Sequence, residues 1–561
     1  MTVEVDPAPL TLIPEAITRT AKRDPDHLAF RMIGEEISYG ELDRRSNSLA
    51  NMLLDRGVSH GDRVGLYAHK SISLFVALHG IMKAGAAYVP INPDAPAAYV
   101  RHVLEECEIT HLVVGQTTRK PALALAEDVG LELLVGIETA DDAVMVVPYD
   151  EVWRYSSAAP DVSVSGDDLA YIILTSGSTG RQKGIMHTHR SGLAYGEVAA
   201  ATYGFHSGDR IANHPPLNFD LSLLELFAGI VVGATIVIIP EAHARLPASL
   251  VQMLEDEQVT VLNAVPFALA QMLHRGALEE RDLSALRWIL FGGEVFPTKD
   301  LRALMQRLPD TRFANVYGPA EVNGVTYYIV PEPPDDTHGP IPIGVLYEGM
   351  RALVVDEADN EVAAGAAGEL LIHSPTHMIG YWRQPELSAR STYHRVDAAG
   401  MTERWHRTGD MVELGEDGLF RLRGRKDRMI KTRGHRVELD EIETVLTGHD
   451  GVEQAVVYAV PDGEGSQQVE AVVTLRGALD GSTESVEPTD LKRYAALFLP
   501  RYAVPELIRI VTSLPRTSTG KADRVALLDQ AVHRSEEVTA LQRHHSAVKQ
   551  VDPVRKPWNG F

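Results

Sequence analysis

TSGSTGRQKG, residues 175–184, follows directly on the apolar stretch YIIL, residues 171–174, which predicts a buried strand. Its glycines allow a ligand to approach the backbone closely. Its N–H groups, its hydroxyls and the amine of Lys183 are the donors that phosphate binding requires. The segment is not the P-loop of NTPases, because no Gly-Lys pair stands at the required distance from Gly177. The pattern favours a phosphate-binding loop over the alternative, a flexible Gly/Ser turn that binds nothing.

Short apolar runs alternate with longer helical patterns through the first two-thirds of the chain. The expected strands are residues 63–67, 111–114, 131–135, 169–174, 234–239 and 259–265. This alternation predicts a mixed α/β fold with largely parallel sheets. PEPPDDTHGPIP, residues 331–342, is too rich in proline for regular structure, and residues 345–373 after it favour a smaller unit of strands.

The composition of the chain argues against several classes of protein. Its 561 residues are enough for about three or four compact units, and a formal net charge of -24 argues against nucleic-acid binding. The single cysteine, Cys107, lies between Glu106 and Glu108, which disfavour a reactive thiolate, so we expect a structural role for it. No signal peptide is visible, and the most apolar stretch, residues 226–240, is shorter than the roughly 20 residues of a membrane span. We therefore expect a cytoplasmic enzyme.

A basic segment late in this acidic chain indicates a domain boundary near Asp427. It is GRKDRMIKTRGHRVE, residues 424–438, and two expected strands, residues 454–460 and 468–475, come after it. We predict a large N-terminal domain of stacked α/β subdomains plus a small β-barrel unit over residues 1–426, a small mobile α+β domain over 427–530, and a helical tail over 531–561. Apolar residues at helical spacing over residues 525–548 favour an interrupted amphipathic helix there.

Residues 175–184 resemble the phosphate loop of the adenylate-forming superfamily: adenylation domains of non-ribosomal peptide synthetases, acyl-CoA synthetases and luciferases. Further segments resemble motifs of that family, in the same order: SYGEL (38–42), KAGAAYVP (83–90), FGGEV (291–295), NVYGPAE (315–321), RTGD (407–410), GRKD (424–427) and TGKADR (519–524). Two positions depart from the family, because Gln182 replaces the usual proline and Ala320 the usual threonine. Without the threonine hydroxyl the chain lacks one hydrogen bond to the α-phosphate. Such a bond to a charged group is worth about 1.5–3 kcal/mol, so we expect slower adenylation.

The resemblance implies that the chain binds ATP and Mg2+. The residues implied to bind the nucleotide are Thr175, Ser176, Gly177, Ser178, Thr179, Gly180, Lys183, Gly293, Glu294, Asn315, Tyr317, Gly318, Asp410 and Arg425. Among these, Tyr317 would stack on the adenine and Asp410 would accept the ribose hydroxyls. Glu321 would hold Mg2+, a cation that takes carboxylate and phosphate oxygens. Each residue alone is more often a surface ion pair or a packed ring, so the ordered set carries the interpretation.

The resemblance also implies the catalytic groups, which are Lys521, Glu321 and Thr175. Lys521 would bridge the substrate carboxylate and the α-phosphate, where it would stabilise the charge that develops. Asp427 matches the hinge about which the small domain of the family turns between two half-reactions.

FDLS, residues 219–222, indicates the class of substrate. In the amino-acid-activating members the matching aspartate, here Asp220, binds the substrate ammonium group; the alternative is an N-cap of the following helix. Motif alignment places the rest of the pocket at Phe219, Leu221, Leu224, Asn263, Leu290, Gly292, Val316, Gly324 and Val325. None is charged, which favours an apolar or mildly polar amino acid. An α-amino acid, a cyclic imino acid as in stand-alone proline activators, and a β-amino acid all remain open.

The expected reaction joins the amino acid carboxylate to AMP with release of pyrophosphate. The aminoacyl group would then pass to the phosphopantetheine thiol of a separate carrier protein in natural-product or antibiotic biosynthesis. A fused carrier domain is not expected, since only 40 residues follow Lys521. The alternatives are an acyl-CoA ligase, which would not need Asp220, and a non-catalytic nucleotide-binding scaffold, which would not need Lys521 and Glu321 together. We expect no membrane or nucleic-acid partner.

Overall fold

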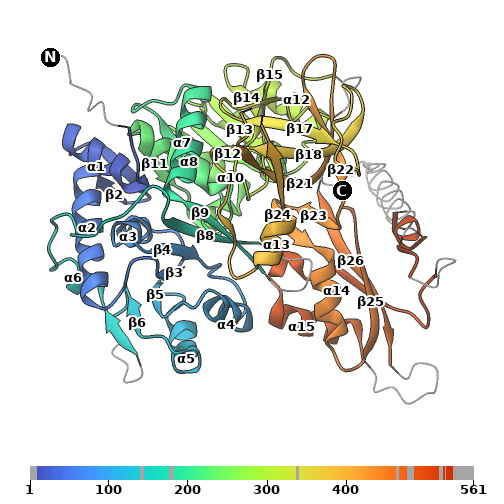
Figure 1. The fold of residues 1–561 in the computed structure, drawn as a ribbon, viewed down its shortest axis with the longest axis horizontal. Helices are drawn as coiled ribbons and strands as arrows, with labels where there is room; N and C mark the ends of the chain where they lie inside the picture. The colour runs from blue at the N-terminus through green and yellow to red at the C-terminus, as the bar shows by residue number, and fades with distance from the viewer. Residues whose placement is uncertain are drawn as a thin grey trace, which may run out of the picture.

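The computed structural model describes residues 9–138, 144–175, 182–335, 340–397, 399–462, 466–476, 486–516, 522–524, 526–532 and 534. Over these residues the chain forms two large sheets, a smaller antiparallel sheet and a C-terminal unit of helices and strands (Figure 1). The prediction of a mixed α/β fold, with a large N-terminal and a small C-terminal domain, is confirmed.

The first sheet contains the strand that leads into the phosphate-loop sequence. In spatial order its strands are β19 (Gly380–Tyr381), β9 (Lys183–Thr188), β8 (Leu169–Thr175), β4 (Ala87–Pro90), β3 (Arg63–Tyr67), β5 (His111–Val114), β6 (Leu133–Val135) and β7 (Met145–Val147). The strands from β8 to β7 are parallel, and β9 and β19 add antiparallel pairs at one side. Every residue of β4 and β5 is buried, as expected for parallel strands covered on both faces.

The second sheet carries the other half of the site. In spatial order its strands are β16 (Val345–Leu346), β15 (Thr326–Val330), β14 (Arg312–Tyr317), β13 (Trp288–Gly292), β12 (Val261–Ala264), β10 (Arg210–Asn213), β11 (Thr235–Ile238), β1 (Leu28–Met32) and β2 (Glu35–Ser38). Side chains alternate between its faces. On β13, Leu290 belongs to the core between the two large sheets, whereas Ile289 and Phe291 belong to a core on the opposite face.

Helices fill the space between the two large sheets and cover their outer faces. The inner layer consists of α1 (Ile13–Arg23), α2 (Tyr39–Asp55), α3 (Ile72–Lys83), α7 (His189–Tyr203) and α8 (Ser222–Val232). The outer layers are α10 (Pro247–Asp256), α11 (Pro266–Arg275) and α12 (Thr298–Arg307) on one side, and α4 (Ala97–Glu106) and α5 (Arg119–Val129) on the other. Short helices are α6 (Tyr149–Val152), α9 (Glu241–Ala244) and α13 (Pro385–Arg390). Glycine at 196 lets α7 cross α8 closely, because a Cβ there would lie 2.8 Å from the backbone of Phe227.

The third sheet is antiparallel and follows the proline-rich loop. Its strands are β17 (Arg351–Val355), β18 (Ala367–His373), β21 (Thr402–Leu414) and β20 (Thr392–Val396), with β22 (Phe420–Arg425) also paired to β21. It occupies the region for which the sequence predicts a small unit of strands. The β21–β22 register sets Asp410 opposite Arg425, and this pair reappears in the site.

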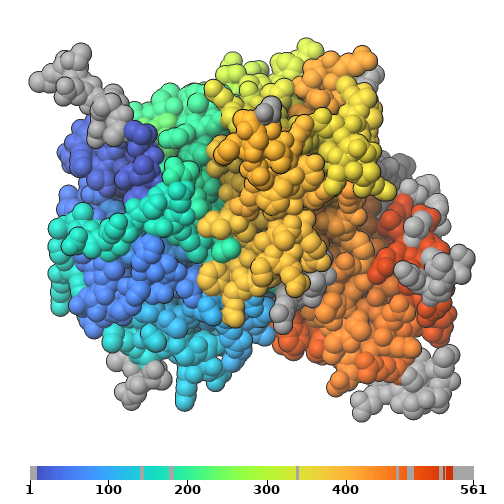
Figure 2. Space-filling model, viewed as in Figure 1, coloured from blue at the N-terminus to red at the C-terminus, as the bar shows by residue number. Residues whose placement is uncertain are grey.

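The C-terminal unit has a hydrophobic core of its own. Its elements are β23 (Met429–Thr432), β24 (His435–Glu438), α14 (Leu439–Thr447), β25 (Val452–Pro461), β26 (Gln467–Leu475), α15 (Pro488–Phe498) and β27 (Leu507–Ile510). Figure 2 shows this unit, in orange and red, packed against the rest of the chain. Of the expected tail helix over residues 525–548, the structure describes 526–532 and 534, where Leu527 and Ala531 pack against β25 residues; the remainder lies outside the described residues.

The hairpin of β23 and β24 is the part of the C-terminal unit that enters the site. Its two-residue loop, Arg433 and Gly434, has positive φ at both positions, 49° and 84°, as a tight turn matched to the strand twist requires. The loop lies against Val265 of the large domain, since a Cβ on Gly434 would be 2.6 Å from the Val265 side chain. The turn therefore needs glycine both for its backbone conformation and for this close approach.

Candidate active site

A cavity lies between the two large sheets and the β23–β24 hairpin. The residues that line it are Tyr99, Ile173, Leu174, Thr175, Tyr195, Asn218, Phe219, Asp220, Leu221, Gly293, Val316, Gly318, Pro319, Ala320, Asn323, Gly324, Asp410, Arg425, Met429, Lys431, Gly434, His435, Arg436 and Tyr502. The set mixes apolar walls with convergent charged groups, which is typical of a small-molecule site.

One end of the phosphate-loop sequence, Thr175, lines this cavity. Thr175 ends β8 and pairs with Lys183, which begins β9, so these two residues lie side by side in the sheet. Five residues expected to bind phosphate lie outside the described residues: Ser176, Gly177, Ser178, Thr179 and Gly180. Lys521, the expected catalytic lysine, also lies outside them.

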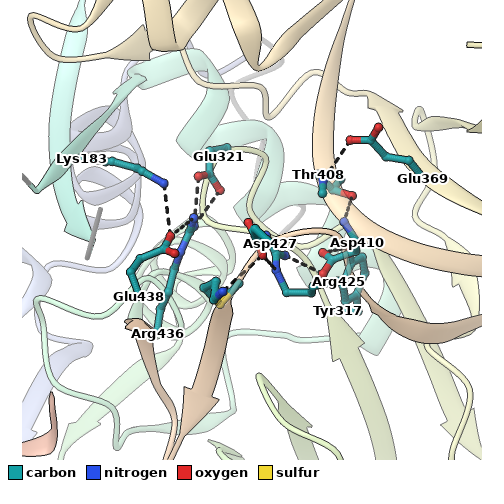
Figure 3. A network of polar contacts seen from close by, with 12 residues as sticks. Lys183, Tyr317, Glu321, Glu369, Thr408, Asp410, Arg425, Asp427, Arg436 and Glu438 are labelled. Carbon is teal, nitrogen blue, oxygen red and sulfur yellow. Dashed lines mark hydrogen bonds and ion pairs between the residues drawn. The ribbon is translucent and has the colours of Figure 1, made fainter. Parts of the chain in front are cut away.

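The hairpin contacts the two charged groups that the sequence assigns to phosphate and metal (Figure 3). Lys183 Nζ lies 3.2 Å from Glu438 Oε1. Arg436 Nη1 donates to Glu321 Oε1 at 3.0 Å and to Oε2 at 3.4 Å, and its Nη2 lies 3.5 Å from Glu438 Oε1. The carboxylates of Glu321 and Glu438 are both buried. The four side chains thus form one continuous ion-pair chain across the boundary between the large domain and the C-terminal unit.

Glu321 is held as a carboxylate in this network. Burial alone raises its pKa, but Arg436, His406 and the Tyr381 hydroxyl, which donates at 2.8 Å, together hold the pKa of Glu321 below its ordinary value. The loop that carries Glu321 joins β14 to β15. It is very tight, since a Cβ on Gly318 would overlap the Asn323 carbonyl. The result is a fixed, ionised carboxylate that is buried against the hairpin.

The residues around Glu321 favour Mg2+ binding in one respect and disfavour it in another. A single ionised carboxylate suits Mg2+, which commonly takes one or two carboxylates and completes its shell with phosphate oxygens and water. No cluster of three or more His, Cys, Asp or Glu side chains able to hold a metal occurs within the described part of the chain. However, Arg436 contacts both oxygens of Glu321. A metal on this carboxylate would therefore compete with the docked Arg436.

The groups expected to bind the nucleoside meet on β14, β21 and β22. The Tyr317 hydroxyl donates to Asp410 Oδ2 at 2.5 Å, and Arg425 Nη1 donates to Asp410 Oδ1 at 2.6 Å. Asn315 Nδ2 donates to the carbonyl of Pro342 at 2.8 Å. A second hollow beside the cavity is lined by all four of these side chains and by Gly293 and Glu294. The aromatic ring, the carboxylate and the amide thus stand together, although they are far apart in the sequence.

The expected hinge residue is tied to this group. Arg425 Nε and Nη2 donate to the two oxygens of Asp427, both at 2.7 Å, so Arg425 joins Asp427 to Asp410. Burial opposes ionisation of Asp427, but Arg425 lowers its pKa below the ordinary value. Glu294 is placed differently, since its Oε1 accepts the N–H of Gly434 at 2.7 Å and so helps to seat the hairpin.

Asp220 lies in the turn before α8 and lines the cavity. It does not cap the helix: Leu221 is the N-cap residue and makes no side-chain cap bond. Burial raises the pKa of Asp220 above its ordinary value, although Lys431 and Arg436 of the hairpin and the N–H of Leu221 act to lower it. An anion in a poorly solvated wall, without a cap role, is suited to a cationic ligand group.

The other residues expected in the substrate pocket divide into two groups. Phe219, Leu221, Val316 and Gly324 line the cavity with Asp220. Those that do not line it are Leu224, Asn263, Leu290, Gly292 and Val325. Of these, Asn263 and the three apolar residues are fully buried behind the wall. A Cβ on Gly292 would lie 2.2 Å from the Val316 carbonyl, so this glycine serves the packing of adjacent strands.

Sequence reasoning missed several groups that line the cavity. Tyr195 of α7 lies under Gly324, whose Cβ would be 2.6 Å from the ring. His435 stacks on Tyr502 with ring centroids 3.8 Å apart, and Phe219 lies near the same imidazole. The basic segment at residues 424–438 was the available signal for the hairpin, but it indicated only a domain boundary. The expected structural role of Cys107 agrees with its burial, which raises the pKa of its thiol to about 12.

Comparison with known proteins gives the class of protein that this fold and site define. The model of the AMP-binding enzyme family matches residues 17–382, and that of the AMP-binding enzyme C-terminal domain matches residues 441–521. The chain belongs to the AMP-binding enzymes. It is a ligase, and enzymes of this family use ATP.

Two relatives share most of the length of the chain. An L-proline--[L-prolyl-carrier protein] ligase of Pseudomonas fluorescens is 33% identical over 93% of this chain and 99% of its own. A ligase of the same name from Streptomyces coelicolor is 34% identical over 87% of this chain and 91% of its own. The amide bond synthetase McbA from Marinactinospora thermotolerans is 24% identical and has the same fold, with a TM-score of 0.80 over 92% of this chain and 99% of that one. Within the described residues, no helix has the length and apolar character needed to cross a membrane.

Proposed function

We propose that this enzyme activates a small uncharged amino acid, with L-proline as the first candidate, and passes it to the thiol of a separate carrier protein. The observation that carries the proposal is Asp220, a carboxylate in the cavity wall that caps no helix and stands beside apolar wall groups. The names of the two ligases support proline and a carrier protein as substrates.

In the first half-reaction an oxygen of the amino acid carboxylate attacks the α-phosphorus of ATP. The bond from that phosphorus to the bridging oxygen of the β-phosphate breaks, and pyrophosphate leaves. Tyr317 and Asp410 position the nucleoside, Lys183 neutralises phosphate charge, and Thr175 and the adjoining loop donate hydrogen bonds to the phosphates. Glu321 would hold Mg2+, whose charge further neutralises the phosphates.

In the second half-reaction the thiol sulfur attacks the aminoacyl carbonyl carbon. The thiol loses its proton, the bond to AMP breaks, and a thioester forms. The docked position of the hairpin suits this step better than the first. Lys183 and Glu321, which the triphosphate and its cation need, are already paired with the hairpin. We assign the pivot to Asp427, so that rotation of the C-terminal unit would withdraw the hairpin and bring Lys521 to the α-phosphate.

The wall residues favour a compact substrate. Tyr195 closes the space below Gly324, and Val316 and Leu221 offer no charged partner to a substrate side chain. A charged side chain would therefore be buried without a partner, which is costly. A cyclic imino acid or a small apolar α-amino acid fits these constraints. An α- and a β-amino acid differ in the distance from amino group to carboxylate, and therefore in the distance from Asp220 to the phosphate that each requires.

Exchange of labelled pyrophosphate into ATP tests the proposal. The panel contains L-proline, L-alanine, L-valine, β-alanine, L-glutamate and L-lysine. We expect exchange with proline or a small apolar member, and none with glutamate or lysine. Exchange with a non-amino acid such as benzoate, together with thioester formation on coenzyme A, would favour the acyl-CoA ligase instead. If no acid supports exchange, the remaining hypothesis is a non-catalytic nucleotide-binding scaffold.

A further inference from the structure

The turn that carries Asp220 is held from behind by three buried polar side chains. It connects β10 to α8, and none of the three, Lys70, Asn263 and Glu225, lines the cavity. All three are buried, two of them completely. Charged and amide groups are rarely buried in a protein interior without a hydrogen-bonding or ionic partner.

Lys70 fixes the start of this segment. Its ammonium group donates three hydrogen bonds to consecutive backbone carbonyls, those of Asn213 at 2.9 Å, His214 at 3.0 Å and Pro215 at 3.3 Å. Three donors and three acceptors satisfy the ammonium group fully. The chain leaving β10 therefore has a defined direction as it approaches Asp220.

Asn263 fixes the end of the segment. From β12 its Nδ2 donates to the carbonyl of Leu221, the residue directly after Asp220, at 3.1 Å. With its amide nitrogen used in this way, Oδ1 is left as an acceptor, and no donor among the described residues reaches it with good hydrogen-bond geometry. A buried amide oxygen of this kind requires a donor close by.

Glu225 interacts with the Asn263 side chain and, in its protonated form, can supply such a donor. It lies in the first turn of α8, four residues after Leu221, and its carboxyl is fully buried beside the Asn263 side chain. Neither of its oxygens has a partner of good hydrogen-bond geometry in the part of the chain that the structure describes. Burial raises the pKa of Glu225 to about 8, against a side-chain hydrogen bond with Asn263 and the charge of Lys70, so the protonated acid with one O–H donor predominates near pH 7.

We propose that Glu225 is a positioning residue for the amino acid. It orients Asn263, and Asn263 together with Lys70 holds the turn that presents Asp220 to the substrate ammonium group. The inference rests on the proposed function, because the ammonium group is the ligand that Asp220 is held for. It adds that the distance from Asp220 to the phosphate, and with it the selectivity for amino acid size, depends on a residue that touches no substrate.

Three variants test this: Glu225→Gln, Glu225→Leu and, as a matched control, Glu257→Leu. The glutamine variant would keep a donor for Asn263 Oδ1, whereas the leucine variant would remove it. Glu257 is a similarly buried carboxylate, paired with Arg31 at 2.7 Å, but it precedes β12 at the end of the sheet away from the cavity. It therefore reports the general effect of losing a buried acid.

The readout is pyrophosphate exchange with the KM of the amino acid, the KM of ATP and kcat measured separately. For Glu225→Leu we expect the KM for L-proline to rise about 10-fold, as for one lost hydrogen bond, with the KM of ATP changed less than about 2-fold. The preference for L-proline over L-alanine and L-pipecolic acid should fall. Glu225→Gln should stay near the wild type, and Glu257→Leu should leave both KM values unchanged.

A second pair of variants tests whether Glu225 acts through Asn263. If Glu225 acts through Asn263, Asn263→Leu should raise the same KM, and the double variant with Glu225→Leu should be no worse than the poorer single variant. Equal rises in both KM values, an unchanged proline KM in Glu225→Leu, or a glutamine variant as poor as the leucine variant would overturn the inference. A wild type without amino-acid-dependent exchange would instead overturn the proposed function, so the two failures are distinguishable.

Discussion

The ion pair between Arg436 and Glu321 makes a sharp prediction about the two half-reactions. In the variant Arg436→Met, docking of the hairpin leaves the buried Glu321 carboxylate without its guanidinium partner, while the Tyr381 hydroxyl still donates to it. Breaking a buried pair on one side costs about 3–5 kcal/mol. Since each 1.4 kcal/mol is a factor of ten, the lower value already reduces the docked arrangement about 100-fold.

The two half-reactions are measured separately for this variant. Pyrophosphate exchange reports adenylation, and single-turnover transfer of labelled amino acid to pantetheine, used as the thiol, reports the second step. We expect transfer to fall by about 100-fold while exchange changes by less than about 3-fold, because the pair exists only with the hairpin docked.

A matched control separates this effect from a general loss of charge. Arg423→Met removes an exposed pair, in which Arg423 Nη2 lies 2.7 Å from Glu413. Exposed pairs contribute little, so both half-reactions should stay within about 2-fold. Equal losses in the two half-reactions of the Arg436 variant, or an undiminished transfer, would refute the assignment of the docked hairpin to the second step.

Three other predictions concern ATP, substrate size and acid stability. Asp410→Asn leaves Arg425 without this charged partner and weakens the ribose contact, so the KM of ATP should rise about 10-fold or more in exchange assays with little change for the amino acid. Gly324→Ala pushes a methyl group to 2.6 Å from Tyr195, so activity should shift towards substrates smaller than proline; an unchanged ranking would contradict the wall assignment. His79 is buried, its pKa is lowered to about 3 by burial and Lys83, and its ring nitrogens have no hydrogen-bond partner within the described residues. Below about pH 6.5 the imidazole of His79 is protonated in the unfolded chain but not in the folded chain. The free energy of unfolding therefore falls by about 1.4 kcal/mol per pH unit of acidification for this group. Urea unfolding at about pH 7.0 and 5.5 should show a smaller loss of stability in His79→Phe than in the wild type.

Local patterns predicted the parts of the structure that depend on local physics. Apolar runs indicated the strands, and β3 and β5 have the bounds expected from the sequence. The glycine-rich segment at residues 175–184 was expected after a strand, and Thr175 does end β8. Such features depend on neighbours in the chain, which a sequence displays directly.

The rest could not be predicted because it depends on contacts between distant residues. Lys183 and Glu438 are 255 positions apart, and nothing in the sequence pairs one charge with the other. Asn263 was expected in the substrate pocket, but the strand it belongs to sets it behind the wall, where it holds the turn instead. Tyr195 has the pattern of an ordinary helix aromatic, and only the fold brings Gly324 against it.

The central claim is that Asp220 recognises the amino group of the substrate. It is tested most directly by comparing L-proline with cyclopentanecarboxylic acid, which has the same ring size and carboxylate but no amine, in pyrophosphate exchange with the wild type and Asp220→Ala. We predict exchange with proline in the wild type only, and none above background with the carbocyclic acid in either protein. Equal exchange with the two acids, or undiminished proline exchange in the alanine variant, would contradict the claim.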